Sequence, residues 1–353
     1  MELNIASDAD RKKWDSLVAN TYGGSVFHTL KYLECLEKHT TTRLFNHQIK
    51  GALYPLVARE GAVIVALFPL FVYSFHGVRL VRSGNDREDL MYLGPVFIEG
   101  DTLKPSKLQI RALRLQKAVD HFLKRELKAL SIHLSISPFY PDARPYLWSN
   151  YDILPLHTHF YYLERGPDAL WADFNKGVRK VIQNAQKNHV SIEPGGLQEA
   201  GFIFDMLHAR NRTNSSKDLV LALVNTLSPN NCNVFVAKKA GTIRSGVIVL
   251  HHGHYAHLWI GFPGSDTDYL GANELLMWEL IKWAHVHGFQ ILENTGADDI
   301  STFQFKRKFN PTLKHYFKAD GSSFFFRSYK WVKKLNHLSH SKLDTYDEKN
   351  EKT

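Results

Sequence analysis

The stretch that decides the fold runs from Gly271 to Tyr316 and reads GANELLMWELIKWAHVHGFQILENTGADDISTFQFKRKFNPTLKHY. In its first part, Asn273–His287, apolar residues recur at helical spacing, and Gly288 follows where a helix commonly ends. A short strand is expected at Phe289–Glu293, and a helix and a strand near residues 300–320. Helices packed beside grouped strands are typical of α+β folds.

The spacing of apolar residues also predicts helices and strands in the rest of the chain. In the second half it predicts helices over Asp168–His189, Leu197–Arg210 and Asp218–Leu227, and strands over Val234–Lys238, Thr242–Leu250 and Tyr255–Phe262. In the first half it predicts helices over Trp14–Asn20, Ser25–His39 and Ser106–Leu130, and strands over Thr42–Lys50, Ala52–Arg59, Ala62–Phe75 and Ser131–Ser137. The proline-rich segment Pro138–Pro155 is a plausible linker between two halves that share a coarse order of elements.

Composition excludes several classes of protein. A length of 353 residues suggests two or three domains, and 44% hydrophobic with 22% charged residues excludes a mainly disordered chain. Two cysteines, Cys35 and Cys232, exclude a disulfide scaffold and a cysteine-built zinc site, and no metal site is expected. No signal peptide is visible, and the longest apolar run, Ala62–Tyr73, is too short to span a bilayer. We therefore expect a cytoplasmic protein.

The positive charge is concentrated near one end of the sequence. The formal net charge is +9, and residues 304–334 alone carry +8, from nine basic residues and Asp320. A strongly basic segment suggests an anionic partner, such as a nucleic acid, a nucleotide-linked substrate or a membrane surface. The segment also contains aromatic residues, among them Tyr329 and Trp331, an interleaving that suits single-stranded RNA or lipid head groups.

Two blocks of the sequence resemble the Fem-type (FemABX) branch of the GNAT acyltransferase superfamily. The first is Gly271–Tyr316, with its long helix, short strand, Gly296 loop and the run Phe305-Lys306-Arg307-Lys308-Phe309. The second is Trp171–Val190, in which Phe174, Arg179, Ile182, Ala185 and Val190 match the family's helix. A weaker match is Ser25–His28. The resemblance implies tandem GNAT-like domains over residues 1–150 and 151–319, with residues 320–335 packing back onto the first. The polar composition of residues 339–353 predicts a disordered tail.

The resemblance also implies an activity, the transfer of an acyl or aminoacyl group to an amine. Branches of the family use aminoacyl-tRNA to extend a cell-wall peptide, or an acyl thioester. No permanently bound cofactor is implied, only aminoacyl-tRNA or acyl-CoA as co-substrate. Neither cysteine lies in a matched block, so we expect direct attack of the amine on the donor carbonyl rather than an acyl-enzyme.

The donor would bind where the Gly271 block begins. In GNAT folds backbone N–H groups at a helix N-terminus hold the donor's pyrophosphate, and by resemblance Gly271, Ala272 and Asn273 take this place, with Tyr269 contacting substrate. The superfamily pattern is Arg/Gln-x-x-Gly-x-Gly/Ala, whereas Asp268–Asn273 has neither the first basic residue nor the second small one. This departure fits the Fem-type branch better than a coenzyme A enzyme. The alternative is a plain glycine loop with Asp268 or Asn273 capping the helix.

Candidate catalytic and substrate-binding residues each have an ordinary structural alternative. By resemblance, Lys306 contacts the acceptor or stabilises negative charge on the attacked carbonyl, or it is a solvated lysine on a surface helix. Either Asp298 or Asp299 can accept the amine proton, or cap the helix at residue 300. The remaining substrate-binding candidates are basic or aromatic residues of the two matched blocks, and their alternative is an ordinary helix face: Phe305, Arg307, Arg179 and Lys180.

Three further expectations complete the sequence analysis. The 19 histidines, including the pairs His157/His159 and His285/His287, are expected to have structural or surface roles. The expected partners are an anionic substrate such as tRNA and, through peripheral contact, a membrane surface, and no stable protein partner is expected. The alternative function is an RNA- or membrane-surface-binding protein that uses residues 304–334 without catalysis.

Overall fold

The computed structural model describes residues 1–44, 47–84, 90, 92–264 and 271–323. The first half of the chain contains strands β1 to β7 and helices α1 to α4. Their bounds are β1 Glu2–Ile5, α1 Asp8–Ala19, η1 Val26–His28, α2 Leu30–His39, β2 Thr41–Leu44, β3 His47–Glu60, β4 Val63–Phe75, β5 Val78–Ser83, β6 Val96–Phe97, α3 Pro105–His121, η3 Phe122–Glu126, β7 Ser131–Ile136 and α4 Arg144–Trp148.

The second half contains strands β8 to β14 and helices α5 to α10. Their bounds are β8 Asp152–Tyr162, η4 Leu163–Arg165, α5 Gly166–Asp173, α6 Lys176–Lys187, β9 Ser191–Gly195, α7 Leu197–His208, α8 Lys217–Leu227, β10 Cys232–Lys239, β11 Thr242–His252, β12 Tyr255–Phe262, α9 Ala272–Val286, β13 Ile291–Asn294, α10 Ile300–Lys306, η6 Arg307–Phe309 and β14 Thr312–Asp320.

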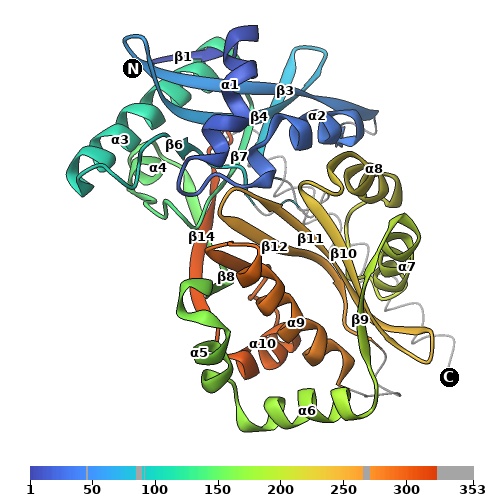
Figure 1. The fold of residues 1–353 in the computed structure, drawn as a ribbon. Coiled ribbons are helices and arrows are strands. Elements are labelled where there is room, and N and C mark those ends of the chain that lie inside the picture. Colours follow the sequence, from blue (N-terminus) through green and yellow to red (C-terminus); the bar gives the residue numbers. More distant parts are fainter. Residues whose placement is uncertain (45–46, 85–89, 91, 265–270, 324–353) are drawn as a thin grey trace, which may run out of the picture.

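All these strands belong to one 14-stranded mixed sheet with helices on both faces (Figure 1). Its main path is β1-β3-β4-β5-β7-β14-β8-β13-β12-β11-β10-β9, with β2 beside β3 and β6 beside β4. Among the described strands only β5–β7 and β12–β13 are parallel pairs, and each is connected through a helix, α3 or α9. The expected α+β class with two similar halves is confirmed, because each half is an antiparallel ladder followed by one helical crossover.

Strand β14 joins the two halves. It pairs antiparallel with β7 over Phe317–Asp320 and with β8 along its whole length, from Thr312↔Phe160 to Asp320↔Asp152. It therefore lies beside the parallel pair of the first half, as β8 lies beside that of the second half. Figure 1 shows β14 passing from the second half, near α5, up into the first half. Neither half has a sheet that ends at the junction.

Three large apolar cores fill the layers between sheet and helices, and a small fourth cluster surrounds Phe139 and Phe160. One core lies between the sheet and α1, α2, α7 and α8, so helices of both halves share it. A second lies between α5, α6, α9 and the second half of the sheet. A third lies under α3, where Leu115, Val119 and Leu123 pack against β4 and β7. The apolar stripe that the sequence places on residues 106–130 is thus the buried face of α3 and η3.

Helix boundaries differ from the sequence expectation where a polar side chain caps a new helix. The helix expected over Asp168–His189 is divided into α5 and α6, because Asn175 accepts the Gly177 N–H at 2.8 Å and starts α6. Thr29 likewise separates η1 from α2 within Ser25–His39. The short helix expected at Trp14–Asn20 begins earlier, at Asp8, where Ser7 and Asp10 form a capping box.

The proline-rich segment 138–155 is more ordered than a linker. It contains α4 and the first residues of β8, and Tyr146 and Tyr151 are buried. Pro155 is compatible with a strand there, because at that position β8 pairs with β14 while β13 pairs only with His159–Tyr162. The predicted return of 320–335 and the tail at 339–353 fall almost wholly outside the described residues, apart from residues 320–323.

We predict that Gly271→Ala destabilises the protein more than Gly288→Ala, at the opposite end of α9. Both glycines have positive φ, 70° and 77°, so each alanine costs roughly 1–2 kcal/mol of backbone strain. Only at Gly271 would the new Cβ clash, 2.6 Å from Val181 Cγ1 and 2.9 Å from the Val181 carbonyl oxygen, whereas nothing lies within 4 Å at Gly288. Overpacking adds roughly 1–3 kcal/mol. Urea unfolding curves measure both losses, and equal losses would contradict the close packing of α9 on α6.

Candidate active site

The parallel strands β12 and β13 part beside a polar site. Their register pairs run from Tyr255↔Ile291 to Leu258↔Asn294, after which β13 ends and β12 continues to Phe262. The β11–β12 register shifts at this point, leaving Trp259 as the extra residue of a bulge. Thr295 follows β13, and its hydroxyl donates to the Leu258 carbonyl at 2.8 Å. The sheet is thus opened after Leu258 and Asn294, and one side chain fixes the opening.

Lys306 holds the loop that leaves β13. The residue is only 6% exposed, and its ammonium group donates to the carbonyl oxygens of Asn294 at 3.1 Å, Gly296 at 2.6 Å and Thr295. Burial lowers the pKa of Lys306 to about 7, and the charge of Glu293 opposes this shift. The surface-lysine alternative is therefore wrong: Lys306 is an internal amine that can exist in both protonation states near neutral pH.

Beneath the opening, Glu293 accepts hydrogen bonds from two strands, β8 and β12, and from the loop that contains Tyr92. Its carboxylate accepts from the Tyr92 hydroxyl at 2.7 Å, from His257 Nδ1 at 2.6 Å and from the Thr158 hydroxyl at 2.6 Å. Burial alone favours the neutral acid, but the hydrogen bond and charge of His257, helped by Thr158 and Tyr92, hold the pKa of Glu293 below its ordinary value. A buried carboxylate is thus kept ionised next to Lys306.

A pocket of about 310 Å³ lies on the face of β8 and β14 that α10 covers. Its lining comes from β8, the loop after β13, α10 and the start of β14: His157, His159, Ala297, Phe303, Arg307, Asn310, Pro311 and Leu313. His157 and His159 share one strand face, two residues apart. Asp298 orients His157, because its carboxylate accepts from Nδ1 at 2.7 Å and from the His157 backbone N–H at 3.0 Å.

His159 is a weak base in this pocket. Burial, and secondly the charge of Lys306, lower its pKa to about 4, so the ring is neutral at pH 7. Its Nδ1 atom is buried and has no hydrogen-bond partner within the described part of the chain. His157 is half-buried in the same lining, and Asp298 holds its ring through Nδ1. The pocket therefore combines an imidazole that a carboxylate orients with a guanidinium, Arg307, that can bind an anionic group.

The structure brings some of the sequence candidates together. Arg307 lines the pocket, Asp298 binds its lining residue His157, and Lys306 fixes residues 294–296, next to lining residue Ala297. Phe305 is half-buried, with its ring 5.3 Å from that of Phe309. These residues surround one site, although their catalytic and binding roles remain predictions.

Asp299 is held as a helix cap. Its carboxylate accepts from Ser301 and from the Thr302 N–H at 3.0 Å, and it lies 3.6 Å from the Arg212 guanidinium. The hydrogen bond from Ser301, followed by that from Thr302, lowers the pKa of Asp299 to about 2. The capping alternative for the helix at 300 thus describes Asp299, while its role as a proton acceptor stays a prediction.

The donor-binding candidates lie at the N-terminus of α9. Gly271 is the N-cap residue, Ala272 is buried, and the Asn273 side-chain oxygen accepts from the Ser245 hydroxyl at 3.0 Å. Glu274 places a buried carboxylate in the first turn, 3.7 Å from Lys308 Nζ. This acid already supplies negative charge at the helix N-terminus, where a donor phosphate would otherwise be most favoured. Tyr269 lies outside the described residues.

Other basic candidates are placed elsewhere or are internally engaged. Arg179 and Lys180 lie on α6 and are not among the residues that line the pocket. Within residues 304–323, Lys306 is buried, Lys308 faces Glu274, and Lys314 Nζ lies 5.5 Å from the centre of the Tyr162 ring. Much of the basic charge in this described part is thus used within the protein. The remainder of the 304–334 segment lies outside the described residues.

Sequence reasoning missed six residues of the site: His157, His159, Tyr92, Thr158, His257 and Glu293. The spacing of His157 and His159 could have predicted that they share a face, since residues two apart on a strand do so. The prolines of 138–155, however, argue against a strand in this region. Tyr92 and Glu293 are 201 positions apart, and no local pattern joins them. Over the described residues, no cluster of three or more potential metal ligands occurs, and no helix is long and apolar enough to cross a membrane.

The buried amine predicts a pH-dependent stability. The folded pKa of Lys306 is about 7 against an ordinary value of 10.5, so folding releases a proton between these values and wild-type stability rises with pH. Urea unfolding from about pH 7 to about pH 9 should therefore show wild type gaining stability relative to Lys306→Met. Lys117→Met, at an exposed position of α3, is the control and should track wild type. A pH-independent difference between wild type and Lys306→Met would refute the lowered pKa.

Comparison with known proteins supports this placement of the site. Residues 198–307 match the family profile for an acetyltransferase (GNAT) domain, a region that contains β12, α9, β13 and Lys306. This match supports N-acyltransferase activity and implies acyl-CoA as co-substrate. A search of curated proteins gives no significant sequence match.

The solved structures of similar fold are distant in sequence. FemX superposes with a TM-score of 0.66 at 10% identity, over 90% of this chain and 97% of that one. A conserved protein of unknown function from Bacteroides thetaiotaomicron gives 0.53 at 12% identity, over 90% and 98%. The C-terminal domain of a putative lysylphosphatidylglycerol synthetase from Agrobacterium fabrum gives 0.51 at 12% identity, over 90% and 93%. The resemblance seen in the sequence is thus confirmed, since residues 198–307 match a GNAT acetyltransferase domain and the fold of the chain is similar to that of FemX.

Proposed function

We propose that this protein is a Fem-type transferase that moves an acyl or aminoacyl group onto an amine of an anionic acceptor, such as a cell-wall precursor. The observation that carries the proposal is the opening between β12 and β13 inside the GNAT-matched region, which Thr295 fixes and next to which Lys306 holds the loop beside the histidine pocket. The opening gives a donor carbonyl a place between two strands, and the pocket supplies acid–base groups next to it.

The chemistry needs one proton acceptor and no protein nucleophile. The acceptor nitrogen attacks the donor carbonyl carbon and the ester or thioester bond breaks. The proton lost by the amine passes by way of His157, which Asp298 orients, to the leaving oxygen or sulfur atom. Lys306, in its charged form, acts on the developing negative charge through space, because its three N–H groups already bond to carbonyl oxygens. Burial raises the pKa of the Cys232 thiol to about 12, so a thiolate is scarce at neutral pH. This supports direct attack without an acyl-enzyme.

Two features of α9 favour aminoacyl-tRNA over acyl-CoA as the donor. The sequence Asp268–Asn273 has no basic residue at the position where the superfamily pattern places one. The buried carboxylate of Glu274 occupies the first turn, where it competes with a pyrophosphate for the positive end of the helix dipole. An ester-linked aminoacyl group makes no such demand on this helix. Arg307 and a peripheral membrane or tRNA contact through the basic segment would bind the anionic parts of the substrates.

The test is a transfer assay with both donor classes. Wild type is incubated with acetyl-CoA or with a mixture of charged tRNAs, and with a cell-wall pentapeptide precursor or a polyamine as acceptor, and products are identified by mass spectrometry. We expect transfer from charged tRNA, and a loss of about 100-fold in kcat for Lys306→Met because the positive charge beside the reacting carbonyl is removed. Lys314→Met is the matched control, with the same charge change in the same segment.

Several outcomes would contradict the proposal. They are no transfer from either donor, an unchanged kcat in Lys306→Met, or a covalent acyl-enzyme trapped with wild type. Salt-dependent RNA binding without turnover would instead support the binding-protein alternative.

The two neighbouring aspartates are expected to differ in function. Asp299→Asn keeps a good N-cap and should leave both Tm and kcat nearly unchanged. Asp298→Asn weakens the hold on His157, so kcat should fall roughly tenfold while Tm changes little. Steady-state kinetics of both variants, with thermal unfolding as the folding control, distinguish the two roles. A larger kinetic loss for Asp299→Asn would show that Asp299, and not Asp298, serves the reaction.

A further inference from the structure

The helices on the two faces of the sheet differ strongly in charge. Helices α1, α2, α7 and α8, which share one core, contain six basic and eight acidic residues. The helices of the opposite face are α3 with η3, α4, α5, α6, α9 and α10 with η6, and they contain 15 basic and six acidic residues. The formal net charge of the helices is thus −2 on one face and +9 on the other. We call the solvent side of the second set the basic face.

Strands β8 and β14 show that these helices lie on one face. Leu313 and Phe317 of β14 are four residues apart, and Leu313 lies opposite His159 of β8, so the three side chains point to the same side. Leu313 and His159 line the histidine pocket, whereas Phe317 lies in the core under α3, with its ring 5.5 Å from that of Tyr146 in α4. Tyr161, two residues after His159, lies in the core of α5, α6 and α9. The basic face therefore extends across both halves and includes the histidine pocket.

Helix α3 and η3 turn a row of cations toward solvent. Lys107, Lys117 and Arg125 are exposed, at helical positions on the side opposite the buried residues. The acids of this segment, Asp120 and Glu126, are already bonded to side chains of the same segment, at 2.9 Å and 3.2 Å. The exposed cations are thus in excess, and they attract an anionic partner.

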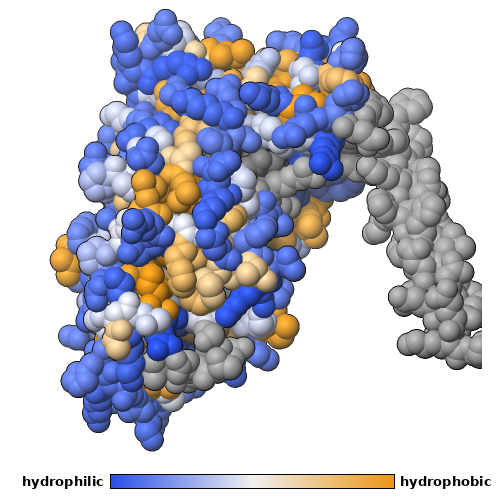
Figure 2. Space-filling model, turned by 90° about the vertical axis from the view of Figure 1, so that its right-hand side faces the viewer, coloured by the Kyte–Doolittle hydropathy of each residue, from blue (hydrophilic) through white to orange (hydrophobic). Residues whose placement is uncertain are grey.

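Large apolar side chains are exposed among these cations. At the end of α4, directly after the buried Tyr146, Leu147 is 51% exposed and Trp148 is 62% exposed. Ile300 and Phe303, one turn apart on α10, are 69% and 45% exposed. Apolar side chains are also exposed on the side of the molecule seen in Figure 2, so exposure alone does not distinguish the basic face. What distinguishes it is the combination of apolar side chains with cations in excess.

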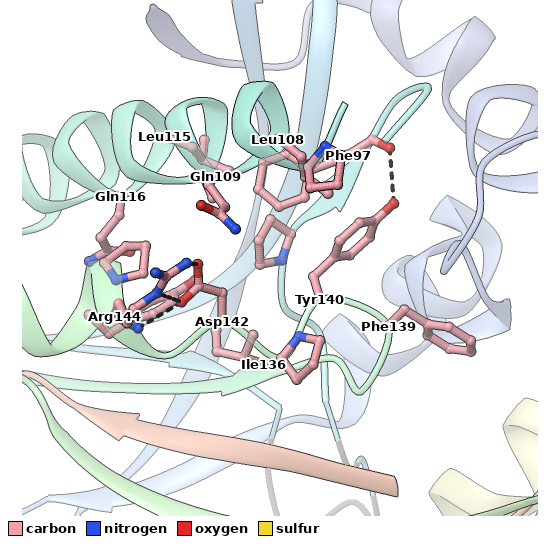
Figure 3. Close-up of a pocket in the computed structure, with 16 residues that line it drawn as sticks. Phe97, Leu108, Gln109, Leu115, Gln116, Ile136, Phe139, Tyr140, Asp142 and Arg144 are labelled. Carbon is pink, nitrogen blue, oxygen red and sulfur yellow. Dashed lines mark hydrogen bonds and ion pairs between the residues drawn. The ribbon is translucent and has the colours of Figure 1, made fainter. Parts of the chain in front are cut away.

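The acids near these apolar residues are engaged by neighbouring side chains. Arg144 Nε and Nη2 donate to the two carboxylate oxygens of Asp142, each at 2.9 Å (Figure 3). Asp299 lies 3.6 Å from the Arg212 guanidinium, and Asp298 is bonded to His157. Because Asp142 and Asp299 are paired with cations, they offer little repulsion to an anionic surface.

We propose that the basic face binds an anionic phospholipid surface. Its lysines and arginines attract acidic head groups, and the exposed side chains of α4 and α10 enter the interfacial region of the bilayer. A nucleic acid would also attract the cations, but the aliphatic side chains of Leu147 and Ile300 have no counterpart in phosphate recognition. Binding would turn the histidine pocket toward the lipid, and only this consequence rests on the acyl transfer proposed above.

The test is co-sedimentation of the full chain with lipid vesicles. Vesicles of phosphatidylcholine with about 30% phosphatidylglycerol should bind the protein, vesicles of phosphatidylcholine alone should not, and about 1 M salt should weaken binding. Equal binding to both vesicles, or binding to neither, would overturn the proposal. Salt-dependent binding of an RNA duplex without vesicle binding would also overturn it and assign the cations to a nucleic acid.

Charge variants test whether this face makes the contact. Lys107→Gln combined with Lys117→Gln should weaken vesicle binding roughly 20-fold, because two exposed cations are lost. Lys12→Gln combined with Lys13→Gln removes the same charge from exposed positions of α1, on the opposite face, and should bind like wild type. Wild-type affinity in the α3 variant, or an equal loss in both variants, would overturn the assignment to the basic face.

Apolar variants test the insertion into lipid. Leu147→Ser combined with Trp148→Ser should weaken vesicle binding roughly tenfold. Leu197→Ser combined with Phe202→Ser, at exposed positions of α7 on the opposite face, is the matched control and should bind like wild type. Tm confirms that each variant is folded. Unchanged affinity in the α4 variant would overturn the proposal, and if that variant does not fold, the α3 charge variant and the two vesicle compositions decide.

Discussion

The pairing of β14 with both β7 and β8 is the constraint on which this structure depends. One strand from near the end of the described chain supplies the neighbour that each half would otherwise need at its edge. An unpaired strand edge inside a protein leaves backbone N–H and C=O groups without partners, a cost that β14 removes for both halves. The halves therefore share a continuous ladder, and α2 and α8 from different halves share one core.

The candidate site residues lie close to β14 because β8, which carries several of them, pairs with this strand. Strand β8, which carries Thr158 toward one face and His157 and His159 toward the other, lies between β14 and β13. Glu293 lies on β13 and bonds to Thr158 of β8, and Lys306 of α10 bonds to the carbonyl of the next residue, Asn294. Such a charged group in a dry interior persists only when its hydrogen bonds are supplied in full. The pairing of β14 with β7 and β8 therefore helps to position these ionisable groups as well as joining the two halves.

The sequence predicts much of the local structure because helices and strands leave periodic patterns. The helix at Asn273–His287, the strand at Phe289–Glu293 and the buried stripe over 106–130 are all present nearly as expected. The errors have local and non-local causes. Asn175 and Thr29 divide helices by capping, which a smooth apolar period hides. β8 was missed because Pro155 is tolerated only where one neighbour is absent, and this depends on a strand far along the chain.

The candidate site could be predicted only in part. The run around Lys306 marks the correct region, but its burial depends on three carbonyl groups that a sequence pattern does not reveal. Asp298 and Asp299 cannot be told apart from the sequence. In the fold, Asp298 bonds to His157, whereas Asp299 caps the N-terminus of α10.

The carboxylate of Glu293 has a consequence for how this sequence can change over evolutionary time. Its partners Tyr92, Thr158 and His257 lie 201, 135 and 36 positions away along the chain. Removing one partner leaves a buried charge short of a bond, while replacing the whole set by apolar residues of similar volume can be nearly neutral. Single substitutions among these four residues are thus disfavoured. The four positions are expected to change together or not at all, as an epistatic unit spread over the chain.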